Sequence, residues 1–327
     1  MTGSVAKPAP AAGMPVAPAW RRLVPGPAYA AVAALVVLVV LNALFTPNFA
    51  TPSNLWNVLL QVSTVVLVAV GMTLVVSTGG IDLSVGSVMA IAGAIAAVLL
   101  DRGVGVAILA ALVGGTLVGV LNGSLIASLG VQPIVVTLAT LIAGRGLAQV
   151  ISHEGELVTI NDPSFALLGR GHLGPIPLQV LIALAVVAAA FFVLRATPFG
   201  RYVLAAGGNP SAARLAGVPV RGTIIAVYAA SAFLASVAGL IVASRLGASD
   251  AAKIGTNMEL DAIAAVVVGG TALSGGRATV LGTVVGALIM QVIATSFNML
   301  LVPYSWSLAL KAAIILVAVY LQRPQRV

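Results

Sequence analysis

Polar side chains recur at helical spacing inside three otherwise apolar stretches of the sequence. Each set places its members at i, i+4 and i+7, so its side chains share one face of a helix. The sets are Asn57, Gln61 and Thr64; Arg145, Gln149 and Ser152; and Gln291, Thr295 and Asn298. Amide, hydroxyl and guanidinium groups form the hydrogen bonds that suit a neutral polyhydroxy solute. These side chains therefore predict a pathway along which such a solute is bound by hydrogen bonds.

A second interpretation explains any single set equally well. Polar side chains inside membrane helices also form hydrogen bonds between helices and so hold a bundle together. We expect all three sets in the same layer, the outer half of the membrane, where together they could line a vestibule. Their common depth favours a pathway over three separate packing contacts.

Two charged side chains inside the apolar stretches are the most costly groups in the sequence. A charge at the centre of a bilayer costs about 2.5–3.5 kcal/mol on insertion scales, so Arg145 and Asp82 should each face a cavity or a partner. Asp261 and Glu259 are the expected partners of Arg145, because all three should lie in the outer half. Asp82 is expected to cap a helix that begins at Leu83, a structural role that we favour over contact with substrate.

The composition requires a membrane scaffold to hold these residues. The chain is 60% hydrophobic and 7% charged, with a mean hydropathy of +1.15, which is typical of polytopic membrane proteins. A span needs about 20 residues, so the chain has room for about eight to ten spans and for no soluble catalytic domain. The net charge of +8 does not indicate nucleic-acid binding, because the basic residues are spread over loops rather than clustered with aromatic residues.

The apolar runs predict an all-α fold, a polytopic membrane bundle of about ten transmembrane helices with broken helices at Gly-rich junctions. The expected spans are 28–45, 56–77, 83–100, 104–128, 131–152, 176–194, 222–244, 259–274, 279–299 and 306–321. The run 259–274 is short and ends in glycine, so a full crossing and a re-entrant segment are both open. Residues 28–322 form the transmembrane domain, between a disordered tail, 1–27, and a short tail, 323–327.

The distribution of basic residues predicts the topology. If both tails lie on one side, the segments on that side hold ten basic residues: Lys7, Arg21, Arg22, Arg195, Arg201, Arg214, Arg221, Arg277, Arg323 and Arg326. The segments on the other side hold four: Arg102, Arg170, Arg245 and Lys253. By the positive-inside rule, the richer side is cytoplasmic. We expect a multi-pass protein of the cell inner membrane, with both termini and loop 195–221 in the cytoplasm.

A glycine-rich motif occurs twice in the chain. The octapeptides Gly79–Gly86 and Gly269–Gly276 agree at five of eight positions, and each follows a Val-rich run. Glycine pairs that interrupt apolar segments at corresponding places in two halves indicate broken helices near a transport path. The other interpretation is two unrelated Gly-rich turns. The expected helix-break residues are Gly79, Gly80, Asp82, Ser84, Gly86, Gly269 and Gly270.

The most basic segment, 195–221, contains four arginines and no acidic residue. Within it, a short helix is predicted by an asparagine at the N-cap, a proline at the first helical position and a glycine after the end. Its residues are Asn209, Pro210, Ser211, Ala212, Ala213, Arg214, Leu215, Ala216 and Gly217. So short a helix is a poor folding unit by itself and suits docking to a cytoplasmic partner. The alternative is a loop whose arginines only fix the topology.

Motifs for soluble enzyme chemistry are missing from the sequence. None of the three lysines follows a glycine, so there is no P-loop for ATP hydrolysis, and neither a nucleophile elbow nor an HExxH motif occurs. The absence of cysteine excludes thiolate metal sites, and His153 and His172 are too few for a zinc site. We expect a chain that is not an enzyme and binds no metal or cofactor, which leaves transport or scaffolding.

Several motifs together resemble the permease subunits of bacterial ABC importers for monosaccharides, of the ribose, xylose and galactose type. These motifs are Gly71-Met72-Thr73, Thr78–Gly86 (TGGIDLSVG), Ala143–Gly146 (AGRG) and the glycine-rich pattern within Gly200–Val218. The resemblance extends over about residues 40–322. Within the family, the stretches AGRGLAQVIS and MELDAIAAVVVGG look most like the galactofuranose-type branch.

The resemblance implies a set of partners. Family members pair two permease chains, identical or paralogous, with cytoplasmic ATPase subunits, which bind ATP and magnesium, and with a periplasmic sugar-binding protein. The helix at 209–217 then matches the coupling segment that docks into a groove of the ATPase. Many relatives carry an acidic residue in the first turn of that helix, where this chain has Ser211. Neither the sugar, the residues that contact it, nor the identity of the second permease follows from the sequence.

Other functions are compatible with the same sequence. An ion-gradient-driven secondary transporter needs titratable groups in its path, and the acids within or beside spans are Asp82, Asp101, Glu259 and Asp261. An ABC permease for nucleosides or branched-chain amino acids shares the layout, but should prefer a more aromatic or more charged cavity. A membrane scaffold or receptor that transports nothing belongs to a third class.

Overall fold

The structure is a computed structural model in which residues 27–321 are described. The two predicted tails lie outside these residues, apart from Pro27. The helices are α1 (Pro27–Phe45), α2 (Pro52–Ser77), α3 (Val85–Leu99), α4 (Val104–Leu129), α5 (Pro133–Ile151), α6 (Pro163–Arg170), α7 (Leu178–Ala196), α8 (Pro198–Gly208), α9 (Pro210–Leu215), α10 (Val220–Leu246), α11 (Met258–Val268), α12 (Val280–Met299) and α13 (Tyr304–Leu321). The expectation of an all-α fold is confirmed.

The remaining elements are short and peripheral. A 3₁₀ turn, Leu100–Arg102, extends α3. Strand β1 (Val158–Thr159) pairs antiparallel with β4 (Ala248–Ser249), and β2 (His172–Leu173) pairs antiparallel with β3 (Ile176–Pro177). Each strand has two residues, so these pairs fasten loops and do not form a separate layer.

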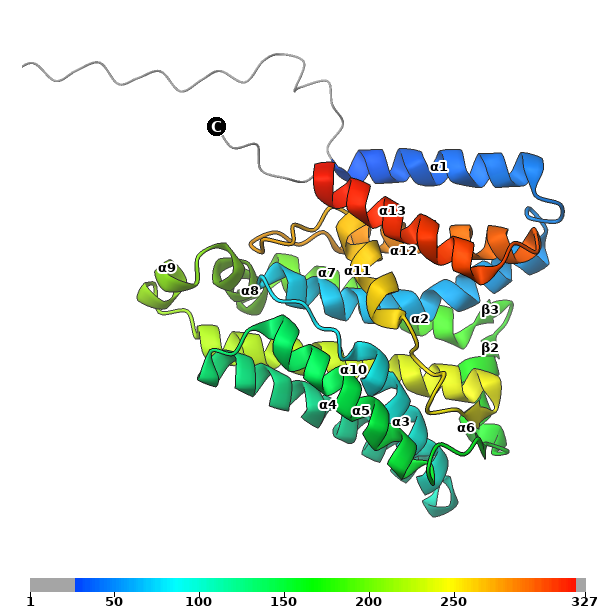
Figure 1. Ribbon diagram of the computed structural model, residues 1–327, viewed down its shortest axis with the longest axis horizontal. Helices are drawn as coiled ribbons and strands as arrows, with labels where there is room; N and C mark the ends of the chain where they lie inside the picture. Colours follow the sequence, from blue (N-terminus) through cyan, green and yellow to red (C-terminus); the bar gives the residue numbers. More distant parts are fainter. Residues whose placement is uncertain (1–26, 322–327) are drawn as a thin grey trace, which may run out of the picture.

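Helix α2 separates two groups of helices (Figure 1). On one side, α10 packs against α3 and α4, and α5 packs against α3; on the other, α12 packs against α1, α11 and α13. Helices α8 and α9 lie at one end of the bundle, here called the α9 end, and α6 with β2 and β3 lies at the opposite end, the α6 end. Helix α1 begins and α13 ends towards the α9 end, so the two ends of the described chain lie on the same side.

Helix α2 is the core of the molecule. Thr51 caps its first turn by accepting a hydrogen bond from the backbone N–H of Asn54, and Pro52 occupies the first helical position. From Val62 to Ser77 every residue is buried, because α7, α10, α11 and α12 surround this part. A helix that is apolar on all sides suits such an interior position.

Among residues 27–321, fewer helices than the ten apolar runs qualify as full spans by length and composition. Seven helices, α2, α3 with its 3₁₀ turn, α4, α5, α7, α10 and α12, are long and apolar enough to cross a membrane, whereas α1 and α13 contain shorter apolar stretches. Helix α11 has 11 residues and is about 16 Å long, half of a hydrocarbon core of about 30 Å. The predicted run 259–274 is therefore a half-length helix, which ends where Gly269 and Gly270 begin a turn. The count of ten spans is not confirmed.

Glycines allow the closest helix contacts. Gly115, Gly119 and Gly123 on α4 face α10, where a Cβ on any of them would overlap atoms of that helix. Gly286 on α12 faces the backbone of Ala265 on α11 in the same way. Small residues at these positions bring helix backbones together, as the spacing of the glycines predicts.

Candidate functional site

Two of the three polar sets meet between α2 and α12. The side-chain amide of Gln291 donates to Oε1 of Gln61 at 3.1 Å and to the hydroxyl of Thr295 at 3.2 Å. Gln61 is exposed, whereas Gln291 and Thr295 are each only 8% exposed. The other members on these helices are Asn57, which is exposed, Thr64, which is buried, and Asn298, which is exposed. We call Gln61, Gln291 and Thr295 the amide cluster.

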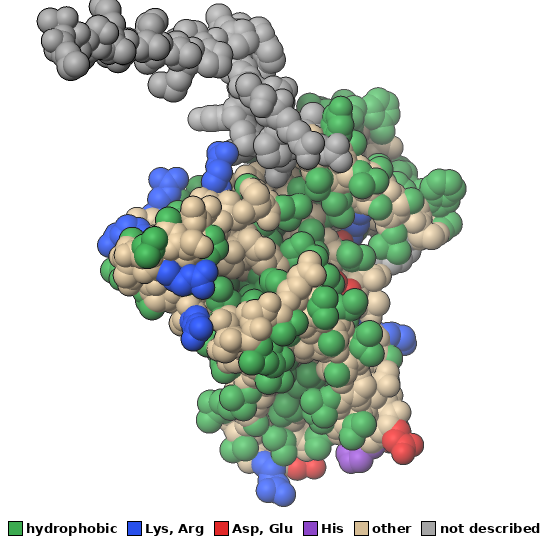
Figure 2. Space-filling view, turned by 60° about the vertical axis from the view of Figure 1, so that its left-hand side comes forward, with side chains coloured by type: hydrophobic (Ala, Val, Ile, Leu, Met, Phe, Trp, Pro, Cys, Tyr) green, Lys and Arg blue, Asp and Glu red, His purple; other side chains and the backbone are tan. Residues whose placement is uncertain are grey.

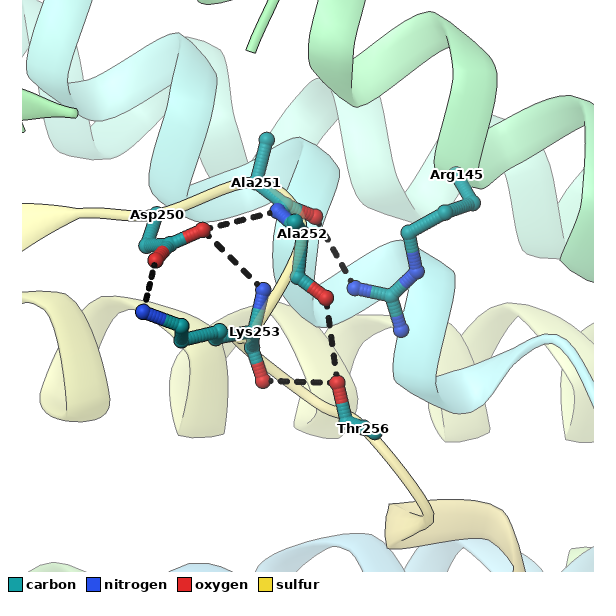
Figure 3. Close-up of polar contacts among 6 residues, drawn as sticks. All are labelled: Arg145, Asp250, Ala251, Ala252, Lys253 and Thr256. Carbon is teal, nitrogen blue, oxygen red and sulfur yellow. Dashed lines mark hydrogen bonds and ion pairs between the residues drawn. The ribbon is translucent and has the colours of Figure 1, made fainter. Parts of the chain in front are cut away.

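The third set lies in another part of the bundle. Helix α5 packs against α3 and α4 rather than against α2 or α12. The Nη1 atom of Arg145 donates to the carbonyl of Ala251 at 3.0 Å and to that of Ile254 at 2.6 Å; Figure 3 shows the first of these bonds and the loop that receives it. Ser152 is buried and bonded within α5, and Gln149 lies beside Gly155. The structure therefore does not unite three sets in one vestibule.

Of the two expected partners of Arg145, Asp261 is wrong, and Glu259 interacts with Arg145 only through its charge. Asp261 pairs instead with Lys311 of α13, whose Nζ lies 2.7 Å from Oδ1. The charge of Glu259 is near enough to influence Arg145, but the two form no direct bond, and the buried Oε2 of Glu259 has no hydrogen-bond partner in the described chain. Instead, the Nη1 atom of Arg145 donates to backbone carbonyls of the loop ahead of α11. The sequence did show Lys311 inside a span, and that unexplained charge was the missed signal.

The prediction that Asp82 caps a helix is wrong, because the N-cap of α3 is Ser84 and no side chain caps this helix. The helix begins at Val85 and not at Leu83. Asp82 accepts hydrogen bonds from the backbone N–H of Ser84 at 3.0 Å and from its hydroxyl at 2.6 Å, and its second oxygen accepts from the hydroxyl of Ser231 on α10 at 3.0 Å. The Asp82 side chain is only 1% exposed. Its hydrogen bonds fix the break between α2 and α3.

The half-length helix α11 begins beside the start of α3. Gly86, in the first turn of α3, packs against the backbone of Gly255, two residues before the N-cap of α11. A Cβ on either glycine would overlap the other's backbone, and Gly255 has φ of +73°, where glycine is favoured. The N-termini of α3 and α11 therefore meet, with the Glu259 carboxylate against Gly86.

The two copies of the glycine motif end their helices with the same turn. In each copy one N–H bonds the carbonyl three residues back and the next N–H bonds the carbonyl five residues back, which is the Schellman pattern. The bonds are Gly79 to Val76 and Gly80 to Val75, and Gly270 to Val267 and Thr271 to Val266. Gly79 has φ of +82° and Gly270 has φ of +86°. The structural equivalent of Gly79 is thus Gly270, one residue later than the sequence match.

At the α9 end, the two motifs lie against each other and against α8. The backbone N–H of Gly276 donates to the carbonyl of Ser77 at 2.9 Å, and the hydroxyl of Ser77 donates to the carbonyl of Arg277 at 3.2 Å. Gly207 of α8 packs on both segments, since a Cβ there would overlap the Ser77 carbonyl and lie 2.7 Å from the Gly276 nitrogen. We call this contact among Gly207, Ser77 and Gly276 the three-segment junction.

The short helix predicted at 209–217 is present as α9. The side chain of Asn209 accepts hydrogen bonds from the N–H groups of Ser211 at 3.1 Å and Ala212 at 3.0 Å, and Gly217 follows the end with φ of +80°. Leu215 is 91% exposed. Figure 2 shows Lys and Arg side chains gathered around this end of the molecule. The exposed arginines of this end are Arg195, Arg201, Arg214, Arg221 and Arg277.

The opposite end presents the longest loop, 153–177, which folds into α6 and the β2–β3 hairpin. Asp162 caps α6 through the N–H groups of Ser164 and Phe165. Ser244 of α10 ties α6 to the bundle, because its hydroxyl donates to the carbonyl of Phe165 at 2.7 Å. Within residues 27–321, no group of three or more His, Asp or Glu side chains could hold a metal ion.

These features define a polytopic helical membrane protein with interrupted helices and a basic, helix-bearing segment at one end. The chain matches, over residues 54–319, the family described as "Branched-chain amino acid transport system / permease component", and it belongs to that permease family. No solved structure matches the chain.

Curated relatives match along most of their length. The chain is 41% identical over 292 residues to the ribose import permease protein of Haemophilus influenzae, covering 88% of this chain and 90% of that one. It is 40% identical to the galactofuranose transporter permease protein of Escherichia coli (88% and 87% covered), and 36% identical to the fructose import permease protein of Bifidobacterium longum (90% and 87%). Identities of 41% and 40% do not single out the galactofuranose branch.

Proposed function

We propose that this chain is the membrane-spanning permease subunit of an ATP-driven importer that carries a monosaccharide. The observation that supports the proposal most is identity of about 40% along most of the chain to permease proteins for ribose and galactofuranose. The bundle of apolar helices and the protruding α9 agree with such a role.

The proposed partners follow from the two ends of the molecule. The α9 end faces the cytoplasm, together with both termini, because the exposed arginines gather there. A separate ATPase subunit, which holds ATP and magnesium, docks on α9, so this chain is not itself an enzyme and holds no cofactor. A second permease chain completes the passage, and a periplasmic sugar-binding protein delivers its cargo at the α6 end, where loop 153–177 is exposed.

The three-segment junction provides a route for movement from α9 into the membrane. Helix α8 leads directly into α9, and Gly207 of α8 packs against the turn that follows α11. Helix α11 is half-length, and its N-terminus abuts that of α3 through Gly86 and Gly255. A displacement of α8 is therefore transmitted through backbone contacts to α11 and α3. Rigid segments packed with so little free space move together rather than deform.

A charge reversal tests the docking of α9. The Arg214→Glu variant should lose uptake while it remains inserted, because an exposed arginine on α9 would then repel a complementary acidic surface. Ala213→Pro, which breaks the helix at its buried residue, should do the same. Arg102→Glu, at the other end of the bundle, is the matched control. Uptake at the wild-type level in both α9 variants would contradict the docking role.

The amide cluster is the proposed contact for sugar hydroxyl groups. The residues that we expect to line the path remain Asn57, Gln61, Thr64, Arg145, Gln149, Gln291, Thr295 and Asn298. Gln61→Leu should lower kcat/KM for uptake about five- to tenfold, the loss of about one hydrogen bond. Thr116→Val is the control, because the Thr116 hydroxyl bonds only within its own helix. Equal effects of the two variants on kcat/KM would remove Gln61 from the path.

An ion-gradient-driven transporter is the second candidate function. The observation that favours it is the buried Glu259 oxygen without a partner beside the meeting point of α3 and α11. Uptake that survives loss of the ATPase subunit but stops on addition of an uncoupler would identify this alternative. Uptake that stops with loss of the ATPase supports the importer.

A further inference from the structure

A cleft of about 470 Å³ lies between α7, α8 and the start of α12. Its lining consists of Phe191, Leu194 and Arg195 from α7, Leu204 from α8, and the segment Ala278–Gly282. The volume falls within the range of about 300–1,000 Å³ that small-molecule sites occupy. No part of the proposed path or of the α9 docking surface uses this cleft.

The walls of the cleft are apolar and remain accessible. Phe191 is 38% exposed and Leu281 is 59% exposed. Both lie on helices that qualify as membrane spans, Phe191 in the last two turns of α7 and Leu281 in the first turn of α12. The cleft is therefore at the edge of the hydrocarbon layer, on the side of the bundle that carries α9. At that depth, an apolar wall faces acyl chains and its outer rim faces headgroups.

The rim of the cleft is positively charged. The guanidinium of Arg195 lies 5.2 Å from the centre of the Phe191 ring, and it forms no hydrogen bond or ion pair with any described residue. Its N–H donors stay available, because stacking on a ring uses the face of the guanidinium and not its edge. Arg201 lies one turn before Leu204 on α8, and Arg277 directly precedes Ala278. Segments 195–221 and 269–281 contain no acidic residue to neutralise these three.

We propose that the cleft binds an anionic phospholipid of the leaflet on the α9 side. The phosphate accepts hydrogen bonds from Arg195, and Arg201 and Arg277 add attraction at longer range. One acyl chain lies along Phe191, Leu194 and Leu281. Basic pockets between membrane helices that open at headgroup depth bind anionic lipid headgroups for these physical reasons. A soluble anion would pair with the arginines but would leave the apolar walls uncovered. The combination of apolar walls and a basic rim therefore favours a lipid.

Quenching by brominated lipids tests the site. In a background in which Trp20, Trp56 and Trp306 are replaced with phenylalanine, a tryptophan introduced at Leu281 reports on lipid in the cleft. A tryptophan at Leu109, which is 64% exposed on α4, reports on bulk lipid. Both variants are reconstituted as full-length protein in vesicles with brominated phosphatidylglycerol or brominated phosphatidylcholine. At position 281, phosphatidylglycerol should quench with an apparent affinity about fivefold higher than phosphatidylcholine, the factor expected for one arginine near the surface. At position 109 the two lipids should quench alike.

A second substitution locates the headgroup. Arg195→Gln in the Leu281→Trp background should remove the preference for phosphatidylglycerol, whereas Arg102→Gln, at the opposite end, should leave it intact. Equal quenching by the two lipids at position 281, or a preference that survives Arg195→Gln, would overturn the proposal. Displacement of the brominated lipid by soluble glycerol phosphate would also overturn it, because the site would then select the anion alone. The readout does not depend on transport, so it stands apart from the proposed function.

Discussion

Replacing Gly207 with alanine should lower uptake at least about tenfold, whereas the same replacement at Gly208 should leave uptake unchanged. The two glycines are neighbours in the last turn of α8, so intrinsic helix propensity changes equally in both variants. Their surroundings differ. A Cβ at Gly207 would overlap the Ser77 carbonyl and lie 2.7 Å from the nitrogen of Gly276, whereas a Cβ at Gly208 would lie 4.0 Å from its nearest neighbour.

The physical reason for the expected loss is that three backbone segments meet at Gly207 with no side chain between them. One segment ends α2, the second belongs to the turn after α11, and the third belongs to α8. An added methyl group must separate α8 from the other two, and overpacking of this kind costs about 1–3 kcal/mol. In the proposed mechanism, that separation interrupts the route from α9 to α11 without touching the surface on which the ATPase docks.

The measurement that checks this prediction compares uptake with ATP hydrolysis in the reconstituted complex. The Gly207→Ala complex should still assemble and hydrolyse ATP, but with much less sugar carried per ATP than in the Gly208→Ala complex. Full coupling in Gly207→Ala would show that movement does not pass through the three-segment junction. Loss of assembly in Gly207→Ala, with the Gly208→Ala complex intact, would place the defect in docking and also contradict the route.

Features that depend on neighbouring residues in the sequence were predictable. The N-cap at Asn209, the proline after it and the glycine at 217 fix α9 through local hydrogen bonds and backbone conformation, and the structure shows each of them. The ends of the apolar runs were less predictable, because α11 already ends at Val268 within the run 259–274 and α3 begins only at Val85. The register of the repeated glycine motif was wrong by one residue, since the turn is defined by bonds to the preceding valines and not by identity.

Features that depend on which helices become neighbours could not be predicted. The helical periodicity of the sequence places Arg145 on a helical face, but its hydrogen-bond partners lie in a loop more than 100 positions later. The sequence gives no distance between α5 and α12, so the expectation that all three polar sets share one vestibule had no packing argument behind it. The amide cluster joins only the sets on α2 and α12 because those two helices are in contact.

The buried ion pair between α11 and α13 gives the largest expected effect on stability. Lys311→Met should destabilise the protein by about 3 kcal/mol, because it leaves Asp261 charged and without its partner inside the membrane. The Nζ of Lys311 lies 2.7 Å from Oδ1 of Asp261, and the side chains are only 8% and 21% exposed. Removal of both charges, in Lys311→Met with Asp261→Leu, should recover most of the loss, since two apolar side chains can replace a buried pair.

Thermal unfolding of the single and double variants in lipid, together with uptake, separates two roles for this pair. Recovery of both stability and uptake in the double variant means that the pair only attaches α13 to the half-length helix. Recovery of stability without uptake means that the charges themselves take part in the movement of α11, the element that joins the glycine-rich turn at one end to α3 at the other. If Lys311→Met were as stable as the wild type, the attachment of α13 through this pair would be disproved. The double variant matters most, because only it distinguishes a helix held in place from a helix whose charge is used.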